Sequence, residues 1–149
     1  MTTINDVALA LAQTWDTRLA SLTIDVNLYV GEMPPAGTLQ SDGATAVPEL
    51  CASVEQVAAP PSNRMMRAGS SAGEMHRDVL CVVRVRGAVH APKAAWDLAV
   101  DMIEAMQNNP PSGYFQVQCS GTPFKLGPTE NPNDAPGYTF EAFASYAET

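Results

Sequence analysis

Residues 79–85 carry the pattern that most constrains the fold. Every second side chain of this segment is apolar: Val79, Cys81, Val83 and Val85. A period of two is typical of a β-strand with one buried face. Leu80 and Val82 make the other face partly apolar as well, which favours a strand in the middle of a sheet. The rest of the chain is therefore expected to pack around this central strand.

Two amphipathic helices are predicted beside it. Apolar residues recur at helical spacing through residues 4–19, and again after Pro92, a residue that suits the first turn of a helix. The apolar stripe of the second helix is Ala95, Trp96, Ala99, Met102, Ile103 and Met106. We expect Trp96 to anchor this helix on the sheet. The helix should end before Pro110.

Four further strands complete the pattern. Alternating apolar residues predict them at residues 22–30, 49–57, 114–120 and 138–146. In the strand at 114–120, Phe115, Val117 and Cys119 should share the buried face. The element order is αβββαββ. The expected fold is α+β, with one mixed, mostly antiparallel sheet of about five strands and two helices on one face.

The chain has the size of a single domain. It contains 149 residues, of which 46% are hydrophobic and only 16% charged, a composition typical of a folded protein. Long loops are expected near residues 31–47, 58–73 and 121–136. Such loops in a compact domain often bind partners.

The charge balance disfavours one class of partner. Against 8 Lys and Arg stand 16 Asp and Glu, a net charge of −8, so attraction to phosphate backbones or anionic lipid is weak. The sequence opens with no signal-peptide pattern, and no apolar run approaches the ~20 residues of a membrane span. We expect a protein made and kept in a cytoplasm, with no membrane partner.

No metal site, disulfide framework or cofactor is expected. The cysteines are odd in number, widely spaced and set among apolar residues, which favours reduced, buried thiols; they are Cys51, Cys81 and Cys119. His76 and His90 lack the short spacing to a second ligand that a metal site needs. No nucleotide-binding fingerprint occurs.

One string matches a catalytic motif. Gly69, Ser71 and Gly73 fit the G-x-S-x-G of serine hydrolases, in which the serine occupies a turn from a strand into a helix. Here an irregular loop precedes the string and a predicted strand follows it. Asp78 and His90 follow Ser71 in an order that a triad would allow, yet the chain is short for a hydrolase sheet with separate loops for both. We therefore expect a flexible turn and no enzyme.

The running order of residues 79–146 is similar to that of one protein family. A strand ending in VVRVRG at 82–87 leads into the helix, and a short strand follows it. The phrase PFKLGPTEN at 123–131 then precedes a last strand that begins YTFEAF at 138–143. In this order, with a P-x-x-L-G phrase and an acidic turn before an aromatic strand, the chain resembles the tail terminator proteins of long-tailed, non-contractile bacteriophages. It departs from them in its longer loops at 31–47 and 58–73 and in extra Pro and Asn residues within the acidic turn.

The resemblance implies a structural virion protein. Such a subunit forms a hexameric ring that caps the tail tube, stops its elongation and offers the surface to which the filled head docks. Its partners are then further copies, the tail tube protein and a head-completion or connector protein, at the head-proximal end of the tail after assembly in the host cytoplasm. DNA passes through without specific binding, which suits the acidic balance, although plain solubility explains the same acidity. The alternatives are another head-tail connector, such as the stopper or adaptor, and a small-ligand or peptide-binding module that uses the uncovered sheet face.

A ring requires two different patches on each subunit. The predicted basic patch contains Arg64, Arg67, Arg84 and Arg86, with Met65 and Met66 as adaptable apolar contacts. The predicted acidic patch is either the outer face of the second helix, with Asp97, Asp101 and Glu104, or the turn with Glu130 and Asp134. For any one of these residues, an ordinary solvated charge is the simpler explanation.

Overall fold

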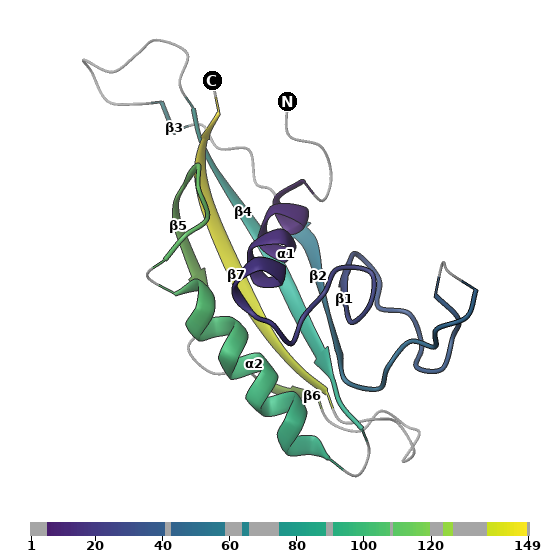
Figure 1. Ribbon diagram of the computed structural model, residues 1–149. Coiled ribbons are helices and arrows are strands. Elements are labelled where there is room, and N and C mark those ends of the chain that lie inside the picture. The colour runs from purple at the N-terminus through teal and green to yellow at the C-terminus, as the bar shows by residue number, and fades with distance from the viewer. Residues whose placement is uncertain are drawn as a thin grey trace.

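The structure, a computed structural model, describes residues 6–40, 43–58, 64–65, 75–88, 91–107, 109–119, 124–126 and 137–148. Within them, two helices lie on one face of a seven-stranded sheet (Figure 1). The helices are α1 (Asp6–Arg18) and α2 (Pro92–Met106). The strands are β1 (Leu28–Val30), β2 (Cys51–Ala58), β3 (Arg64–Met65), β4 (Met75–Arg86), β5 (Tyr114–Cys119), β6 (Phe124–Leu126) and β7 (Gly137–Glu148).

Five strands form the body of the sheet in the order β1-β2-β4-β7-β5. β1 is parallel to β2, and the other neighbours are antiparallel. With the short β3 and β6 set aside, the chain order is αβββαββ. This confirms the predicted α+β class, the mostly antiparallel mixed sheet and the helices on one face.

β4 and β7 form the spine of the sheet. They pair from Met75 opposite Glu148 to Arg86 opposite Gly137. β3 pairs with β4 beyond the end of β2, and β6 pairs with β7 beyond the end of β5. The predicted loops at 58–73 and 121–136 therefore contain a short strand each, because the long central strands offer backbone hydrogen-bonding groups past the ends of their shorter neighbours. The described part of the loop at 31–47 contains only an isolated bridge, between Leu39 and Ala46.

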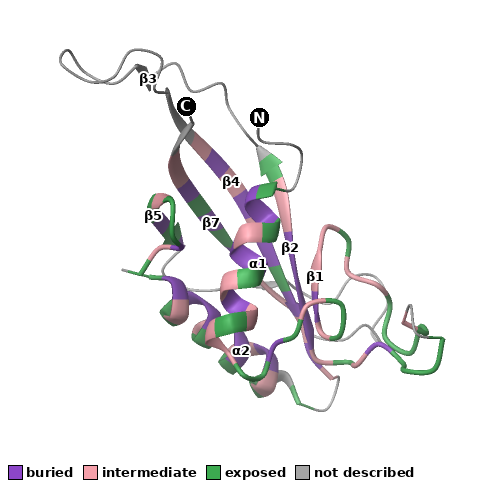
Figure 2. Ribbon diagram, turned by 45° about the horizontal axis from the view of Figure 1, so that its top comes forward, coloured by how far each residue is buried: buried purple, intermediate pink, exposed green. Residues whose placement is uncertain are grey.

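The core lies between the helices and the inner sheet face (Figure 2). Trp15 of α1 is 0% exposed, and its Nε1 donates to the carbonyl of Met102 in α2 at 2.9 Å. Its ring meets Phe140 of β7 edge-on, with the centroids 6.2 Å apart. Trp15 thus joins both helices to the sheet. The remaining inner-face residues are Ala52, Val54, Val79, Cys81, Val83, Val85, Val117, Cys119, Ala142 and Ala144.

Trp96 is not the anchor that the sequence predicts. It is only partly buried and meets Tyr138 edge-on, with ring centroids 5.4 Å apart. Leu98, absent from the predicted stripe, is 6% exposed and belongs to the core. The other predicted stripe residues of α2 are buried. Trp96 and Leu98 both lie near the boundary of the apolar stripe. The packing of α2 against the sheet decides which of these two side chains is buried.

The strand predicted at residues 22–30 is wrong over most of its length. Only Leu28–Val30 form β1, and a turn precedes them. The Asn27 side chain accepts a hydrogen bond from the Thr23 amide at 2.7 Å, and Asp25 adopts a φ of 65°, a left-handed conformation that Asp tolerates. Local side-chain hydrogen bonds of this kind compete with strand pairing.

Phe115 was expected on the buried face but is 55% exposed. The register of β5 against β7 shifts between Tyr114 and Gln116, so Phe115 is the extra residue of a bulge. Val117 and Cys119, beyond the bulge, are buried as predicted.

Candidate assembly surface

The structure gives no support to the hydrolase motif. The string at 69–73 and His90 lie outside the described residues, as does the side chain of His76. The element after the string is the strand β4, where a nucleophilic serine needs a helix. Asp78 accepts a hydrogen bond from Ser145 Oγ at 2.8 Å. In the part of the chain that the structure describes, no three His, Cys, Asp or Glu residues could hold a metal ion.

The predicted burial of the three thiols is confirmed. Burial raises the pKa of Cys81 to about 12 and that of Cys119 to about 11. It also raises the pKa of Cys51, an effect that the neighbouring Arg86 guanidinium partly opposes. Neutral thiols in such surroundings are structural rather than reactive.

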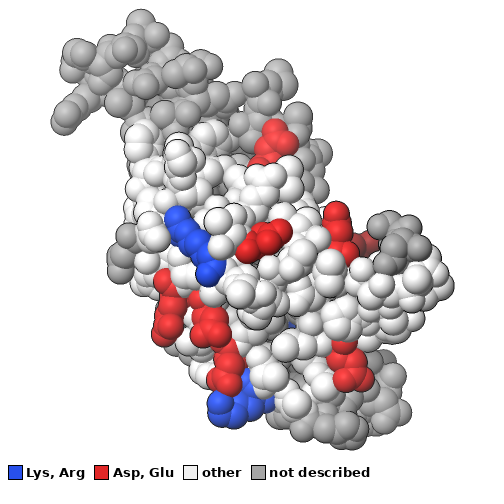
Figure 3. Space-filling view, viewed as in Figure 1, with Lys and Arg blue, Asp and Glu red and all other residues white. Residues whose placement is uncertain are grey.

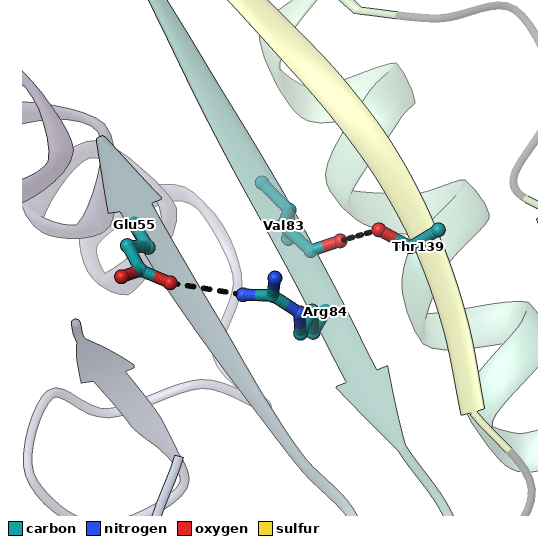
Figure 4. A network of polar contacts seen from close by, with 4 residues as sticks. All are labelled: Glu55, Val83, Arg84 and Thr139. Carbon is teal, nitrogen blue, oxygen red and sulfur yellow. Dashed lines mark hydrogen bonds and ion pairs between the residues drawn. The ribbon is translucent and has the colours of Figure 1, made fainter. Parts of the chain in front are cut away.

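Arg84 lies on the outer sheet face, the one without helices (Figure 4). Its Nη1 is 3.0 Å from Glu55 Oε2 on β2, and the two side chains are 45% and 38% exposed. On the other side of β4, Thr139 Oγ1 of β7 donates to the Val83 carbonyl at 3.0 Å. Exposed ion pairs contribute only about 0–1 kcal/mol. A partner could therefore compete for Arg84 at small cost.

Arg86 holds a loop of its own subunit. It donates to the carbonyls of Pro34 at 2.8 Å, Pro48 at 3.1 Å and Glu49 at 3.3 Å, and to Cys51 Sγ at 3.0 Å. These contacts fasten the segment 31–50 to the end of β4. Because its donors are used inside the subunit, we assign Arg86 to the loop rather than to an interface.

Two of the predicted arginines, Arg64 and Arg84, lie far apart along the sheet. Arg64 lies in β3 opposite His76, and Arg84 is eight residues farther along β4, roughly 27 Å at ~3.4 Å per residue. Met66 and Arg67 lie outside the described residues, and only the backbone of Arg64 and Met65 is described. β3 is at the end of the sheet beyond both helices (Figure 1).

The acidic residues of α2 do come together. Asp97, Asp101 and Glu104 are exposed, and their spacing of four and three residues places them on one helix face. Lys93 Nζ lies 2.7 Å from Asp97 Oδ2. Figure 3 shows the acidic patch over α2. The alternative acidic turn, with Glu130 and Asp134, lies outside the described residues.

The outer sheet face, which the binding-module alternative would use, carries an apolar row that is not among the predicted interface residues. Leu80 and Val82 of β4 are only partly buried, and Phe143, which pairs with Leu80 across β7, is 39% exposed. Glu55 and Glu141 flank Val82 on the two neighbouring strands. The sequence signal was the second apolar face of residues 79–85, which alone does not show whether helices cover that face.

A groove of about 340 Å³ lies under the loop at 31–50, lined by Asp25, Tyr29, Pro34, Leu39, Gln40 and Val47. Two of its polar side chains already have partners. Tyr29 OH and Gln40 Nε2 both donate to the Val26 carbonyl, at 2.8 and 3.0 Å. The groove thus offers a ligand few unsatisfied groups that could fix its orientation.

Among the described residues, neither helix has the length and apolar character that crossing a membrane requires. No family model matches the chain, and no curated protein matches its sequence.

Proposed function

We propose that this chain is a ring-forming structural protein of a phage virion, a tail terminator that caps the tail tube, stops its elongation and offers a surface for head attachment. The order of elements supports this proposal. β4, α2, β5, β6 and β7 follow one another in the running order on which the resemblance to tail terminators rests. The net charge of −8 suits a ring through which DNA slides without adhering.

The observation that carries the proposal is the apolar row on the outer sheet face, the one that neither described helix covers. In an antiparallel sheet with helices on one side, the other face commonly meets solvent and is polar. Here Leu80, Val82 and Phe143 interrupt that polar face. Contiguous exposed apolar residues rimmed by polar ones mark interaction surfaces. Assembly with other proteins is therefore favoured over a solitary role. It is also favoured over a small-ligand module, because Tyr29 and Gln40 of the groove are already hydrogen-bonded.

Light scattering coupled to size exclusion, over a range of protein concentrations, tests the proposal together with negative-stain images. We expect closed rings and binding to the ends of purified tail tubes that lack their own terminator. Rings that bind head-completion proteins but no tube end would favour a stopper or adaptor. A chain that stays monomeric at every concentration and never binds tube ends would exclude both.

A further inference from the structure

The outer sheet face combines apolar and acidic side chains. Leu80, Val82 and Phe143 form its apolar row, and the acidic residues on the same face are Asp78, Glu55 and Glu141, because paired residues of neighbouring strands point to the same side. Two described cations share this face. Arg84 pairs with Glu55, and Arg86 is used by the loop at 31–50. The apolar row of this face is therefore flanked by Asp78 and Glu141 and by the Glu55–Arg84 ion pair, which is exposed and weak.

One segment of the same chain has the complementary character. Residues 64–67 read Arg-Met-Met-Arg, two flexible apolar side chains between two cations. Methionine adapts to irregular apolar surfaces, and arginine pairs well with carboxylates.

The described part of this segment, β3, lies beside the sheet of its own subunit. β3 pairs with β4 edge to edge, with Arg64 opposite His76 and Met65 opposite Met75. The backbone of Arg64 and Met65 therefore extends the sheet in its plane. Figures 1 and 2 show β3 at the tip of the sheet, beyond the helices, a position from which it can reach a second copy.

We propose that residues 64–67 of one copy dock on the outer sheet face of a second copy, with the two methionines on Leu80, Val82 and Phe143 and the two arginines beside the surrounding carboxylates. The contact joins two different patches, so it repeats from copy to copy and can close a ring. This inference rests on the proposed ring and names the contact that builds the ring. The acidic face of α2 fits less well, because Asp97, Asp101 and Glu104 match the arginines but offer nothing apolar to the methionines.

Site-specific crosslinking tests the contact directly. A Met66→Cys chain is mixed with a Phe143→Cys chain and treated with a short bismaleimide. The matched control replaces Phe143→Cys by Leu9→Cys, because Leu9 is 40% exposed and Phe143 39%, but Leu9 belongs to α1 on the opposite side of the sheet. The three native cysteines are buried, and the unsubstituted chain measures any background from them. We expect at least about ten times more crosslinked dimer with Phe143→Cys than with Leu9→Cys.

Charge reversal provides a second readout. Arg64→Glu with Arg67→Glu should raise the concentration at which rings form by at least about tenfold, which corresponds to ~1.4 kcal/mol. In that background Glu141→Lys should partly restore assembly, whereas Asp101→Lys, at a position on α2 that is also exposed, should not. Restoration by Asp101→Lys alone would assign the contact to α2 and overturn the proposal.

The outcomes separate this contact from the proposed function. Rings that form normally while the Phe143→Cys product stays at the Leu9→Cys level would overturn the contact and leave the terminator proposal standing. If the wild-type chain forms no ring and binds no tube end, light scattering contradicts the function itself, and absence of the crosslink then excludes the contact independently.

Discussion

Replacing Arg86 by Met should loosen the loop at 31–50 and destabilise the subunit. Methionine keeps much of the apolar stem and removes every donor that reaches Pro34, Pro48 and Glu49. A hydrogen bond to a charged group is worth about 1.5–3 kcal/mol net. The three bonds should not add in full, because Arg86 is only partly buried and some carbonyls can regain water. We expect a loss of about 2–4 kcal/mol in the free energy of unfolding.

Arg84→Met is the matched control. Arg84 lies two residues away on the same face but forms one exposed ion pair, with Glu55, so its loss should cost about 0–1 kcal/mol. Urea unfolding followed by circular dichroism gives both values. Hydrogen exchange locates the effect, because the Gly37 amide donates to the Val47 carbonyl and the Val47 amide to the Thr38 carbonyl within the fastened loop. The exchange rate of these amides should rise in Arg86→Met and stay unchanged in Arg84→Met.

Two results would refute the reasoning. An equal loss of unfolding free energy in the two variants would mean that water replaces the hydrogen bonds from Arg86 to these carbonyls at no net cost. A large loss with unchanged exchange at Gly37 and Val47 would mean that Arg86 stabilises the subunit by a route other than the loop.

Three further predictions concern the core. Gly87→Ala should cost about 1–3 kcal/mol in thermal unfolding, because its Cβ would lie 2.8 Å from the Ala95 side chain; an unchanged melting temperature would contradict this close approach. Trp15→Ala should cost about 3–5 kcal/mol and clearly more than Trp96→Ala, because only Trp15 is fully enclosed; the reverse order in urea unfolding would contradict the core assignment. Labelling of Cys81 and Cys119 in the native protein should stay slow at pH 9 and become fast in denaturant, because burial keeps these two thiols protonated at that pH. The stability linked to their raised pKa values is present below pH 9 and is lost as pH rises toward about 11 and about 12, the values of Cys119 and Cys81.

The sequence by itself determined the number, type and order of the main elements. In residues 79–85 and 138–146 every second side chain is apolar or aromatic, and both segments lie within the two long central strands, β4 and β7. Both helices could also be predicted, because apolar residues at a period of 3.6 can be recognised in the sequence whatever the helix packs against. Burial of the cysteines followed from their apolar neighbours.

Tertiary structure decided the features that depend on contacts between distant residues. The bulge that exposes Phe115 exists only in the register of β5 against β7, and the burial of Trp15 rather than Trp96 depends on how two helices meet one sheet. Arg84 and Arg86 are alike in sequence, yet only Arg86 donates to the carbonyls of a loop that lies 37 to 52 residues earlier in the chain. For the same reason the sequence indicated a second apolar face on residues 79–85 without showing which of the two faces the helices cover, because periodicity records which side chains share a face but not what packs against that face.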